Sequence, residues 1–496
     1  MADSWLYAFF YGLHLLAAAA AALHILLNMR DDSERASLWL ILVAAFPVLG
    51  VILYLFAGLS RRNSLGSRLE RAGNEFDDPG SDSARKFFAE YNAALSGFVA
   101  PEKEESIRNI SFRVMLDRVF PDSPPLLGNS VELLRDGDAA YPMMIDAIRK
   151  AKKSIHLQSF IIANDSVGKM IFDALEKKAR HGVEVKVIYD SFGSFSAILS
   201  HFFHRYSRRN SRMQIRAFVH SNLFAPWKIQ LRNHRKLLVT DGETAFLGGI
   251  NISADNFRLI NRRAPAIHDL HCRVRGPAVG MLQRSFLRDW CYAANLAPDN
   301  VLNKDAFPPP VSCGNDLVRV IASGHGHCYQ GTEKAFFTAT ATARRYIWIN
   351  TPYFVPDHAF SKALRIAAQR GVDVRILLPE KNNHWYMKMA GRSLYESLLS
   401  DGVRIFERHG NFSHAKAMLV DGEWTLFGSS NCDVRSFRLN YELDIVVSGG
   451  DFLSSIHDQF RHEFAQSREI LFEEIRSRGF FTRLLESLCA LFTPVL

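Results

Sequence analysis

Apolar residues are distributed very differently in the first sixty positions and in the rest of the chain. Two long apolar stretches, 5–27 and 38–59, contain no Asp, Glu, Lys or Arg. A helix of about 20 apolar residues spans the roughly 30 Å hydrocarbon core of a bilayer. Each stretch is long enough for that, so residues 1–60 are predicted to form a membrane anchor of two transmembrane helices.

Two other interpretations of these stretches are weaker. Buried core helices seldom run to this length without a polar face. A cleavable signal peptide normally carries Lys or Arg ahead of its apolar core, and none precedes Trp5. Pro47 and Gly50 lie inside the second stretch, where membrane helices tolerate them.

The charges beside the two stretches predict their orientation. The loop between them holds Arg30 and Arg35 together with three acidic residues. Four arginines follow the second stretch, at positions 61, 62, 68 and 71. Positive residues favour the cytoplasmic side of a membrane. The pattern therefore predicts a helical hairpin with both ends, and the rest of the chain, in the cytoplasm.

From residue 126 onward, apolar strands and amphipathic helices alternate in two related series. In each series a buried strand precedes a helix, the helix ends at a glycine, and a second strand follows. The strands are expected at 154–161 and 183–188, then at 346–350 and 372–378, with Gly182 and Gly371 as the helix-ending glycines. Strand–helix–strand order is typical of parallel strands covered by helices, an α/β class.

This repetition predicts the domain organisation. Residues 61–125 form a linker and connecting segment that includes the polar, turn-rich stretch 77–83. A first half covers 126–307 and a second half covers 308–496, with three consecutive prolines from Pro308 at the joint.

One polar motif occurs once in each half. It reads His-x-Lys-x4-Asp-x6-Gly-[Gly/Ser]-x-Asn, and a single chance match over a chain of this length is roughly a one-in-ten-thousand event. Its members are His234, Lys236, Asp241, Gly249 and Asn251 in the first half, and His414, Lys416, Asp421, Ser429 and Asn431 in the second.

The motif offers one imidazole, one ammonium and one amide in each half. On a strand, His-x-Lys places both side chains on the same face. Asp-Gly then supplies a turn, and the small residues before the asparagine let the backbone approach a ligand. Two such half-sites facing each other would surround one phosphate group.

This set of groups suits phosphodiester transfer. The lysines and asparagines can stabilise the charge of the phosphate. One imidazole can attack phosphorus and form a phosphohistidine, while the other protonates the leaving alkoxide and then deprotonates the incoming alcohol. Two lysines make a metal unnecessary, so no metal and no other cofactor is predicted. His325 and His327 are interpreted as part of a loop.

Net charge and cysteine usage narrow the partners. A formal charge of +9 favours anionic partners. Six cysteines without a Cys-x-x-Cys pair argue against a disulfide scaffold or zinc ribbon. The basic residues ahead of His234 form either a solvated face or a patch for anionic headgroups. Nucleic acid suits a membrane-anchored chain less well than phospholipid. The basic residues ahead of His234 are Arg205, Arg208, Arg209, Arg212, Arg216, Lys228 and Arg232, with Phe218 and Trp227 among them.

The last apolar stretch, 480–492, is a candidate helix. It forms either a helix lying on the membrane or a helix packed in the core. Core packing is the preferred interpretation.

The sequence resembles the phospholipase D superfamily over nearly its whole length and, within it, the bacterial cardiolipin synthases. Beyond the two motifs, the resemblance rests on segments around Pro47, 131–138, 189–194, 274–278, 289–290, 351–356, 433–437 and 440–442. It implies two phospholipase D-like α/β/α halves with pseudo-twofold symmetry. It also implies phosphatidyl transfer between two phosphatidylglycerols, which gives cardiolipin and glycerol. A phospholipase D or another phosphatidyltransferase is the alternative, and the complete motifs argue against an inert lipid-binding scaffold.

The resemblance further implies an acidic residue that orients each histidine. By placement, Asp269 is expected to serve His234 and Glu442 to serve His414. His234 is then the nucleophile, and His414 the acid and base. Asn251, Asn431, Gly249 and Ser429 are expected to bind substrate. The segment 323–330 departs from the usual loop of the family.

Overall fold

The computed structural model describes residues 2–29, 33–55, 62–101, 110–219, 231–258, 266–324 and 330–491. The chain divides into two compact units, Met1–Arg68 with Ser221–Gln230, and Leu69–His220 with Leu231–Leu496. Several residues named above lie outside the described residues, namely Arg30, Arg61, Trp227, Lys228, His325 and His327.

The N-terminal unit contains α1 (Ala2–Asn28), α2 (Ser33–Ala45) and α3 (Pro47–Leu53). Within the described residues, one helix is long and apolar enough to cross a membrane, over Tyr11–Asn28 of α1. The second predicted span is divided into two helices, because the helix stops at Phe46 and restarts with Pro47 in its first turn. Proline favours that position, where its missing N–H costs no hydrogen bond.

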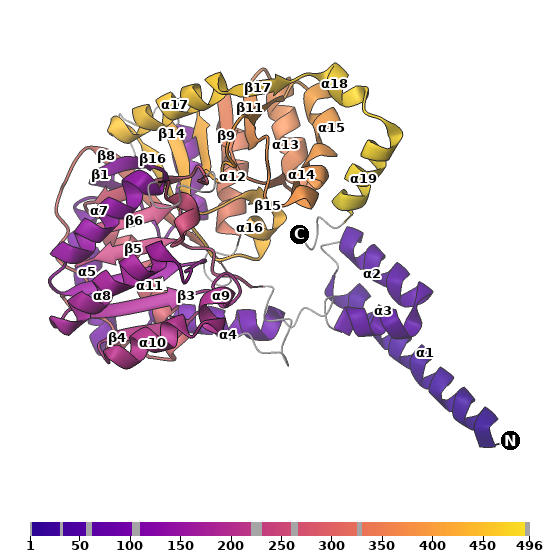
Figure 1. Ribbon diagram of the computed structural model, residues 1–496, viewed down its shortest axis with the longest axis horizontal. Helices are drawn as coiled ribbons and strands as arrows, with labels where there is room; N and C mark the ends of the chain where they lie inside the picture. Colours follow the sequence, from indigo (N-terminus) through magenta and orange to yellow (C-terminus); the bar gives the residue numbers. More distant parts are fainter. Residues whose placement is uncertain are drawn as a thin grey trace. The chain divides into compact units, whose positions relative to one another are not determined.

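The larger unit is built on one sheet of 15 strands. Figure 1 shows this sheet with helices packed against it. A separate two-stranded sheet pairs β10 with β15. The first seven strands are β1 (Leu126–Arg135), β2 (Ser154–Ser159), β3 (Glu184–Tyr189), β4 (Met213–Ala217), β5 (Leu237–Thr240), β6 (Thr244–Gly248) and β7 (Leu270–Arg275). The others are β8 (Asp316–Ser323), β9 (Tyr346–Asn350), β10 (Phe354–Val355), β11 (Asp373–Pro379), β12 (Arg404–Arg408), β13 (Ala417–Val420), β14 (Trp424–Gly428), β15 (Cys432–Asp433), β16 (Glu442–Ser448) and β17 (Ser467–Ile470).

The strand order of this sheet repeats from its middle outward. One side runs β1, β7, β6, β5, β2, β3, β4, and the other runs β8, β16, β14, β13, β9, β11, β12, with β17 added at the edge. The two series meet where β1 pairs antiparallel with β8. The α/β class is confirmed, and the repeated order follows the two predicted halves.

The predicted strand–helix–strand units are present in both series. β2 and β3 are parallel and joined by α8 (Ser166–Arg180), and β9 and β11 are parallel and joined by α13 (His358–Gln369). Gly182 and Gly371 follow these helices with φ of 92° and 90°. Only glycine adopts this left-handed conformation freely, so both positions are C′ glycines as predicted.

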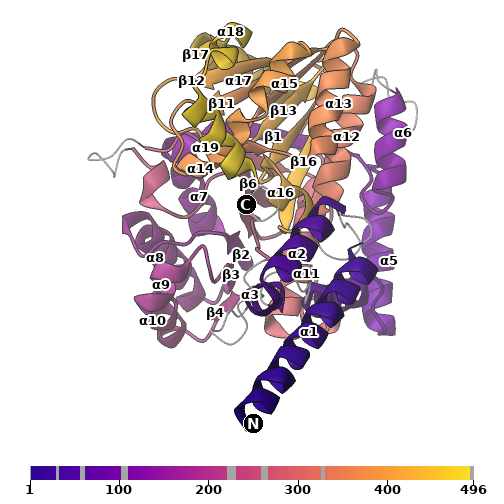
Figure 2. The same cartoon turned by 90° about the vertical axis from the view of Figure 1, so that its right-hand side faces the viewer.

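Helices cover both faces of the sheet (Figure 2). One apolar core lies under α7 and α8 in the first series, and a second lies under α12 and α13 in the other series. α11 and α17 contact the sheet as well. The remaining bounds are α7 (Asp136–Lys150), α9 (Phe195–Leu199), α10 (Phe202–Arg209), α11 (Ala278–Ala294), α12 (Gly331–Thr342), α14 (Trp385–Arg392), α15 (Tyr395–Ser400), α16 (Val434–Arg438), α17 (Gly450–Ala465), α18 (Phe472–Arg476) and α19 (Phe480–Ala490), with 3-10 turns Ala254–Asn256 and Pro298–Asn300.

The connecting segment 61–125 is largely helical. It contains α4 (Arg62–Asp77), α5 (Asp82–Ser96) and α6 (Ile110–Val119). Ser81 caps α5 by accepting a hydrogen bond from the backbone N–H of Ala84. Phe112 of α6 stacks on Trp424 with ring centroids 3.9 Å apart. α6 is therefore packed into the core of the larger unit.

Candidate active site

The two histidine motifs meet where the two halves of the large unit contact each other. His234 and Lys236 lie in an extended segment just before β5, and His414 and Lys416 lie in the same place before β13. Each segment is hydrogen bonded to the opposite half. The backbone N–H of His234 donates to the carbonyl of Tyr441 at 2.9 Å, and that of His414 donates to the carbonyl of His268 at 2.7 Å.

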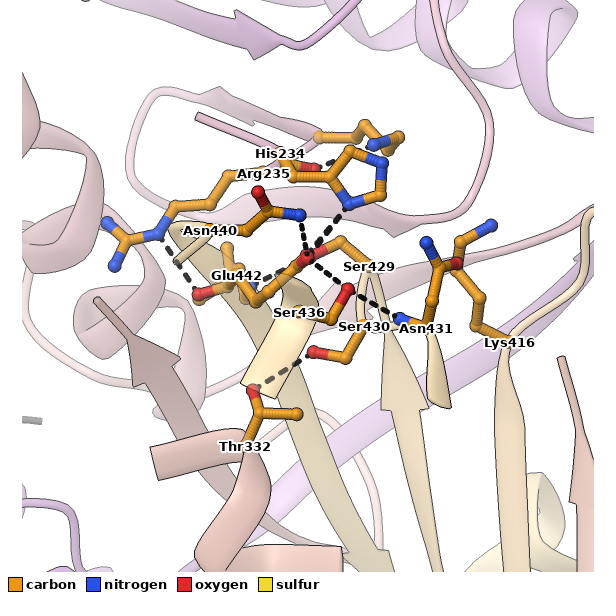
Figure 3. A network of polar contacts seen from close by, with 12 residues as sticks. His234, Arg235, Thr332, Lys416, Ser429, Ser430, Asn431, Ser436, Asn440 and Glu442 are labelled. Atoms are coloured by element: carbon orange, nitrogen blue, oxygen red, sulfur yellow. Dashed lines mark hydrogen bonds and ion pairs between the residues drawn. The ribbon is translucent and has the colours of Figure 1, made fainter. Parts of the chain in front are cut away.

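Glu442, at the start of β16, holds the imidazole of His234. The Nδ1 atom of His234 is 2.9 Å from Oε2 of this buried carboxylate. Glu442 also accepts hydrogen bonds from Ser429 at 2.5 Å, Ser436 at 2.8 Å and Asn440 at 3.1 Å (Figure 3). A carboxylate with this many donors is held in place, and it keeps the proton of His234 on Nδ1. The Nε2 atom is then free to act on a substrate.

Asp269 holds the imidazole of His414 in the equivalent way. Its Oδ2 atom is 2.8 Å from Nδ1 of His414, and its Oδ1 atom accepts from the backbone N–H of Leu270 at 2.8 Å. Gly249 provides the space for this carboxylate, because a Cβ atom there would lie 2.0 Å from Oδ1 of Asp269.

The predicted pairing of acids and histidines is therefore wrong. Asp269 serves His414 and Glu442 serves His234, so each acid crosses to the histidine of the other half. The reason lies in the backbone. The segment that carries each histidine pairs with the segment just before the acid-bearing strand of the opposite half, through bridges Asn233–Tyr441 and His268–Ser413.

Gly249 and Ser429 differ because the acids differ in length. In the second half, the hydroxyl of Ser429 donates to the longer Glu442. In the first half, the shorter Asp269 occupies the space where the side chain of residue 249 would be. Both residues therefore position a carboxylate, and the substrate contact expected of them stays a prediction.

The two lysines bring positive charge into a buried site. Nζ of Lys236 donates to the carbonyl of His234 at 2.7 Å, and Nζ of Lys416 lies 2.8 Å from Nδ1 of His414. Burial and the charge of Lys416 lower the pKa of Lys236 to about 7. Burial lowers the pKa of Lys416 to about 8.

The same forces act on both histidines. Burial, followed by the charges of Lys236 and Lys416, holds the pKa of His234 well below its ordinary value. Burial and Lys416 lower the pKa of His414 to about 4. Because charges from each half act on the histidine of the other, the two half-sites form one electrostatic unit. An anion bound there would favour the protonated form of all four groups.

His268 joins the two halves next to this site. Its Nδ1 atom is 2.7 Å from Asp136 of the first half, and its Nε2 atom is 2.8 Å from Glu463 of the second. Although burial lowers it, hydrogen bonds to these two carboxylates raise the pKa of His268 to about 9. His268 is thus a charged link between the halves at neutral pH.

Asp241 and Asp421, predicted to be catalytic, lie at the far ends of β5 and β13. The carboxylate of Asp241 accepts from the backbone N–H groups of Lys152, Lys153 and Ser154 at 2.7–3.0 Å. Asp421 accepts in the same way from residues 344–346 at 2.7–2.9 Å. Four strand residues at about 3.3 Å each separate them from the lysines. These aspartates therefore anchor the first residue of β2 and of β9, the strands that begin the two strand–helix–strand units.

The two asparagines of the motif are used differently. Oδ1 of Asn251 accepts a hydrogen bond from the backbone N–H of Ile161 at 3.2 Å. Oδ1 of Asn431 is buried, and in the part of the chain that the structure describes it has no hydrogen-bond partner. Substrate binding by these amides stays a prediction.

Several residues that support the site were not predicted to be functional from the sequence. Arg235 points away from its neighbour His234 and pairs with Asp289 at 2.7 Å. Asp190 accepts from the backbone N–H of Asn233 at 3.0 Å. Both acids lie in segments that carry the family resemblance, which was the only indication of their importance. The charge of Arg435 adds to the forces that lower the pKa of His234.

The predicted basic cluster divides in the structure. Arg232 is buried, with its guanidinium 3.8 Å from the ring centroid of Phe192, and its pKa is lowered to about 10 by burial. The other described arginines of the cluster are exposed on α10, β4 and the turn between them, at positions 205, 208, 209, 212 and 216. Arg232 alone among them adjoins the site, through Asp190 and Arg435.

Comparison with known proteins agrees with this geometry. A family model described as "Cardiolipin synthase, PLD-like domain" matches residues 144–290 and 338–466, and a "Phospholipase_D-nuclease N-terminal" model matches 16–58. Cardiolipin synthase A of Pseudomonas fluorescens is 33% identical, with 98% of this chain and 100% of the relative covered. Cardiolipin synthase of Alkalihalophilus pseudofirmus is 32% identical, covering 92% and 88%.

One solved structure supports the fold. The phosphatidylserine synthase of Haemophilus influenzae aligns with a TM-score of 0.58 at 14% identity, over 76% of this chain and 97% of that chain. The paired half-sites on one repeated sheet define a phospholipase D-like phosphatidyltransferase. Within that class, the chain belongs to the cardiolipin synthase family. The N-terminal match and the apolar helix α1 associate it with a membrane.

We predict that Gly249→Ala inactivates the site without unfolding the protein. The new Cβ would meet the carboxylate of Asp269, which must then leave His414. A displacement of about 1 Å in a catalytic group can reduce turnover on the order of a hundredfold. Steady-state turnover and thermal unfolding should be measured together, with Gly97→Ala as the control because a Cβ at Gly97 meets nothing within 4 Å. Turnover within threefold of the original would contradict the role given to Gly249.

Proposed function

We propose that the chain synthesises cardiolipin from two molecules of phosphatidylglycerol and releases glycerol. The observation that supports this most is the pairing of two buried half-sites, each with an acid-held imidazole and an ammonium, around one position for a phosphate. Full-length relatives named cardiolipin synthase support the choice of substrate. Phospholipase D activity, or transfer to another acceptor, is the alternative, since water or another alcohol could enter the same site.

In the proposed mechanism, Nε2 of His234 attacks the phosphorus of the first phosphatidylglycerol. A P–N bond forms and the P–O bond to glycerol breaks, while His414 gives its proton to the departing alkoxide. His414 then removes the proton from a hydroxyl of the second phosphatidylglycerol. That oxygen attacks phosphorus, the P–N bond breaks, and His234 is regenerated.

The surroundings of both histidines suit these roles. A nucleophile must be neutral, and the lowered pKa of His234 keeps it so. A general acid must carry a proton, which the negative charge of bound phosphate favours on His414. Lys236 and Lys416 supply positive charge to the phosphate, so the proposed reaction has no metal step. The assignment of the two roles rests on the family resemblance, because both histidines have an acidic partner.

We further propose that α1 and the pair α2–α3 both cross the inner membrane, with the catalytic unit in the cytoplasm. The 18 residues 36–53 carry no charge and would measure about 27 Å as helix, close to the roughly 30 Å of a hydrocarbon core. The domain limits 1–60, 61–125, 126–307 and 308–496 belong to the same proposal. A cysteine placed in the loop 31–34 should react with an impermeant reagent from the periplasm, and one at Ser83 should not. The reverse result would invert the orientation.

The product assay tests the reaction itself. Purified full-length protein, given phosphatidylglycerol as its only lipid in the presence of EDTA, should release cardiolipin and glycerol in equal amounts. Thin-layer chromatography and mass spectrometry identify both products. Phosphatidic acid without cardiolipin would instead establish a phospholipase. Activity that disappears with EDTA and returns with one divalent ion would exclude the metal-free mechanism.

The two histidine substitutions should fail at different steps. With a phosphatidyl ester of p-nitrophenol, His414→Ala should form the covalent adduct, since this leaving group needs no proton, and should then stall. His234→Ala should form none. Phosphohistidine is acid-labile, so the adduct must be mapped under alkaline conditions after rapid quenching. An adduct on His414 would reverse the roles, and the absence of any adduct in the unsubstituted enzyme would favour direct displacement.

A further inference from the structure

The C-terminal helix α19 (Phe480–Ala490) has its apolar and polar sides reversed. Phe480 and Phe481 are 73% and 82% exposed, whereas Glu486 is 1% exposed. Four leucines share the outward side, at positions 484, 485, 488 and 491, each between 43% and 63% exposed. At 100° per residue these six side chains occupy an arc of about 140°. The preferred prediction of core packing is therefore wrong.

Ion pairs fix this reversed orientation. Glu486 is bonded to Arg478 and lies 3.2 Å from Nε of Arg392 on α14. Arg392 also lies 3.3 Å from Glu407, whose side chain is buried. Cys489, on the same side as Glu486, packs with Met387 and Ala390 of α14. Rotating the helix to bury its phenylalanines would break the ion pairs that Glu486 makes with Arg478 and Arg392. Leaving buried charges without partners is costly.

α19 packs against α14, which lies beside it in both views of the fold (Figures 1 and 2). Trp385, the first residue of α14, is 62% exposed. We call Trp385 together with Phe480, Phe481, Leu484, Leu485, Leu488 and Leu491 the α19 patch.

Aromatic contacts join the α19 patch to the active site. Trp385 meets Tyr386, Tyr386 meets His384, and His384 meets Tyr353, with ring centroids 5.5–6.1 Å apart. Tyr353 in turn lies 6.3 Å from the ring of His414. The N-terminal end of α14, the helix against which α19 packs, is therefore connected through these rings to His414.

We propose that the α19 patch docks the catalytic unit onto the surface of a bilayer that contains anionic phospholipid. A helix with one apolar side and a charged neighbour binds in this way, with its apolar side among the upper acyl chains. The only charged residue on the exposed surface of α19 is Arg483, which suits an anionic surface. A bilayer is the occupant because the chain is membrane-associated through α1, and because its phosphatidyl substrate resides there.

Docking would bring the site within reach of lipid headgroups. Contact through α19 holds the His414 side of the site toward the lipid surface. This inference rests on the proposed lipid substrate for its activity test, but its physical test needs no turnover.

The physical test measures the depth of α19 in a bilayer. Full-length protein with Cys313 and Cys328 changed to serine receives one cysteine, at Phe481 or, as a control, at Ile366, which is 48% exposed on α13. Each cysteine carries an NBD fluorophore, and the protein is reconstituted in vesicles of phosphatidylglycerol and phosphatidylethanolamine. Spin labels on the acyl chains should quench the probe at 481 at least fivefold more than the probe at 366.

Two outcomes of that test would overturn the proposal. Equal quenching of both probes by aqueous iodide, with little quenching by lipid, would show that α19 faces water. Disulfide cross-linking between two copies through position 481, in vesicles and in detergent alike, would show that a second chain covers the patch.

The activity test separates docking from chemistry. The triple variant Phe480→Ser, Phe481→Ser, Leu484→Ser should raise the KM, expressed as mole fraction of lipid in vesicles, by about tenfold or more. Its kcat on short-chain phosphatidylglycerol dissolved as monomers should stay within twofold, as should that of the control Ile366→Ser. An equal loss on both substrates, with an unchanged unfolding temperature, would contradict a docking role. Absence of cardiolipin from the unsubstituted enzyme would count against the proposed function and leave the quenching result valid.

Discussion

The crossed pairing of His234 with Glu442 and His414 with Asp269 is the constraint on which the site depends. Each pair takes its two members from different halves, so neither half contains a complete site. The backbone bonds from His234 to Tyr441 and from His414 to His268 follow the same crossing. Separating the halves would expose two carboxylates that are fully buried and break both pairs. Removing one partner of a buried charged pair typically costs about 3–5 kcal/mol.

This crossing also explains the charge of the site. Burial lowers the pKa of both lysines, and the charge of Lys416 lowers that of Lys236 further, while Asp269 and Glu442 offset part of the effect. The arrangement is unfavourable when empty and becomes favourable when a phosphate is bound. The charged His268, with one carboxylate partner in each half, helps to hold the halves together beside it. The structure thus maintains a site that is complementary to an anion before the anion arrives.

Much of the fold and site could be predicted because the information was local. The strands at 154 and 346, the C′ glycines and the two His-x-Lys motifs follow from residues close together in sequence. The pairing of acids could not, because it depends on which half each extended segment contacts. The roles of Asp241 and Asp421 were also misjudged, since their place in the motif says nothing of the three backbone N–H groups that surround each of them. For α19, the apolar stretch suggested a helix but could not show which side faces the protein, which the buried Glu486 decides.

The crossed pairing can be tested most directly by transient kinetics of Glu442→Gln and Asp269→Asn, using a phosphatidyl ester whose alcohol leaves without a proton. If Glu442 holds the nucleophile, Glu442→Gln should slow formation of the phosphohistidine on the order of a hundredfold. Asp269→Asn should form the adduct at close to the original rate and slow only its transfer to the second lipid. The opposite pattern, with Asp269→Asn blocking the adduct and Glu442→Gln blocking its transfer, would contradict the crossed arrangement with His234 as nucleophile.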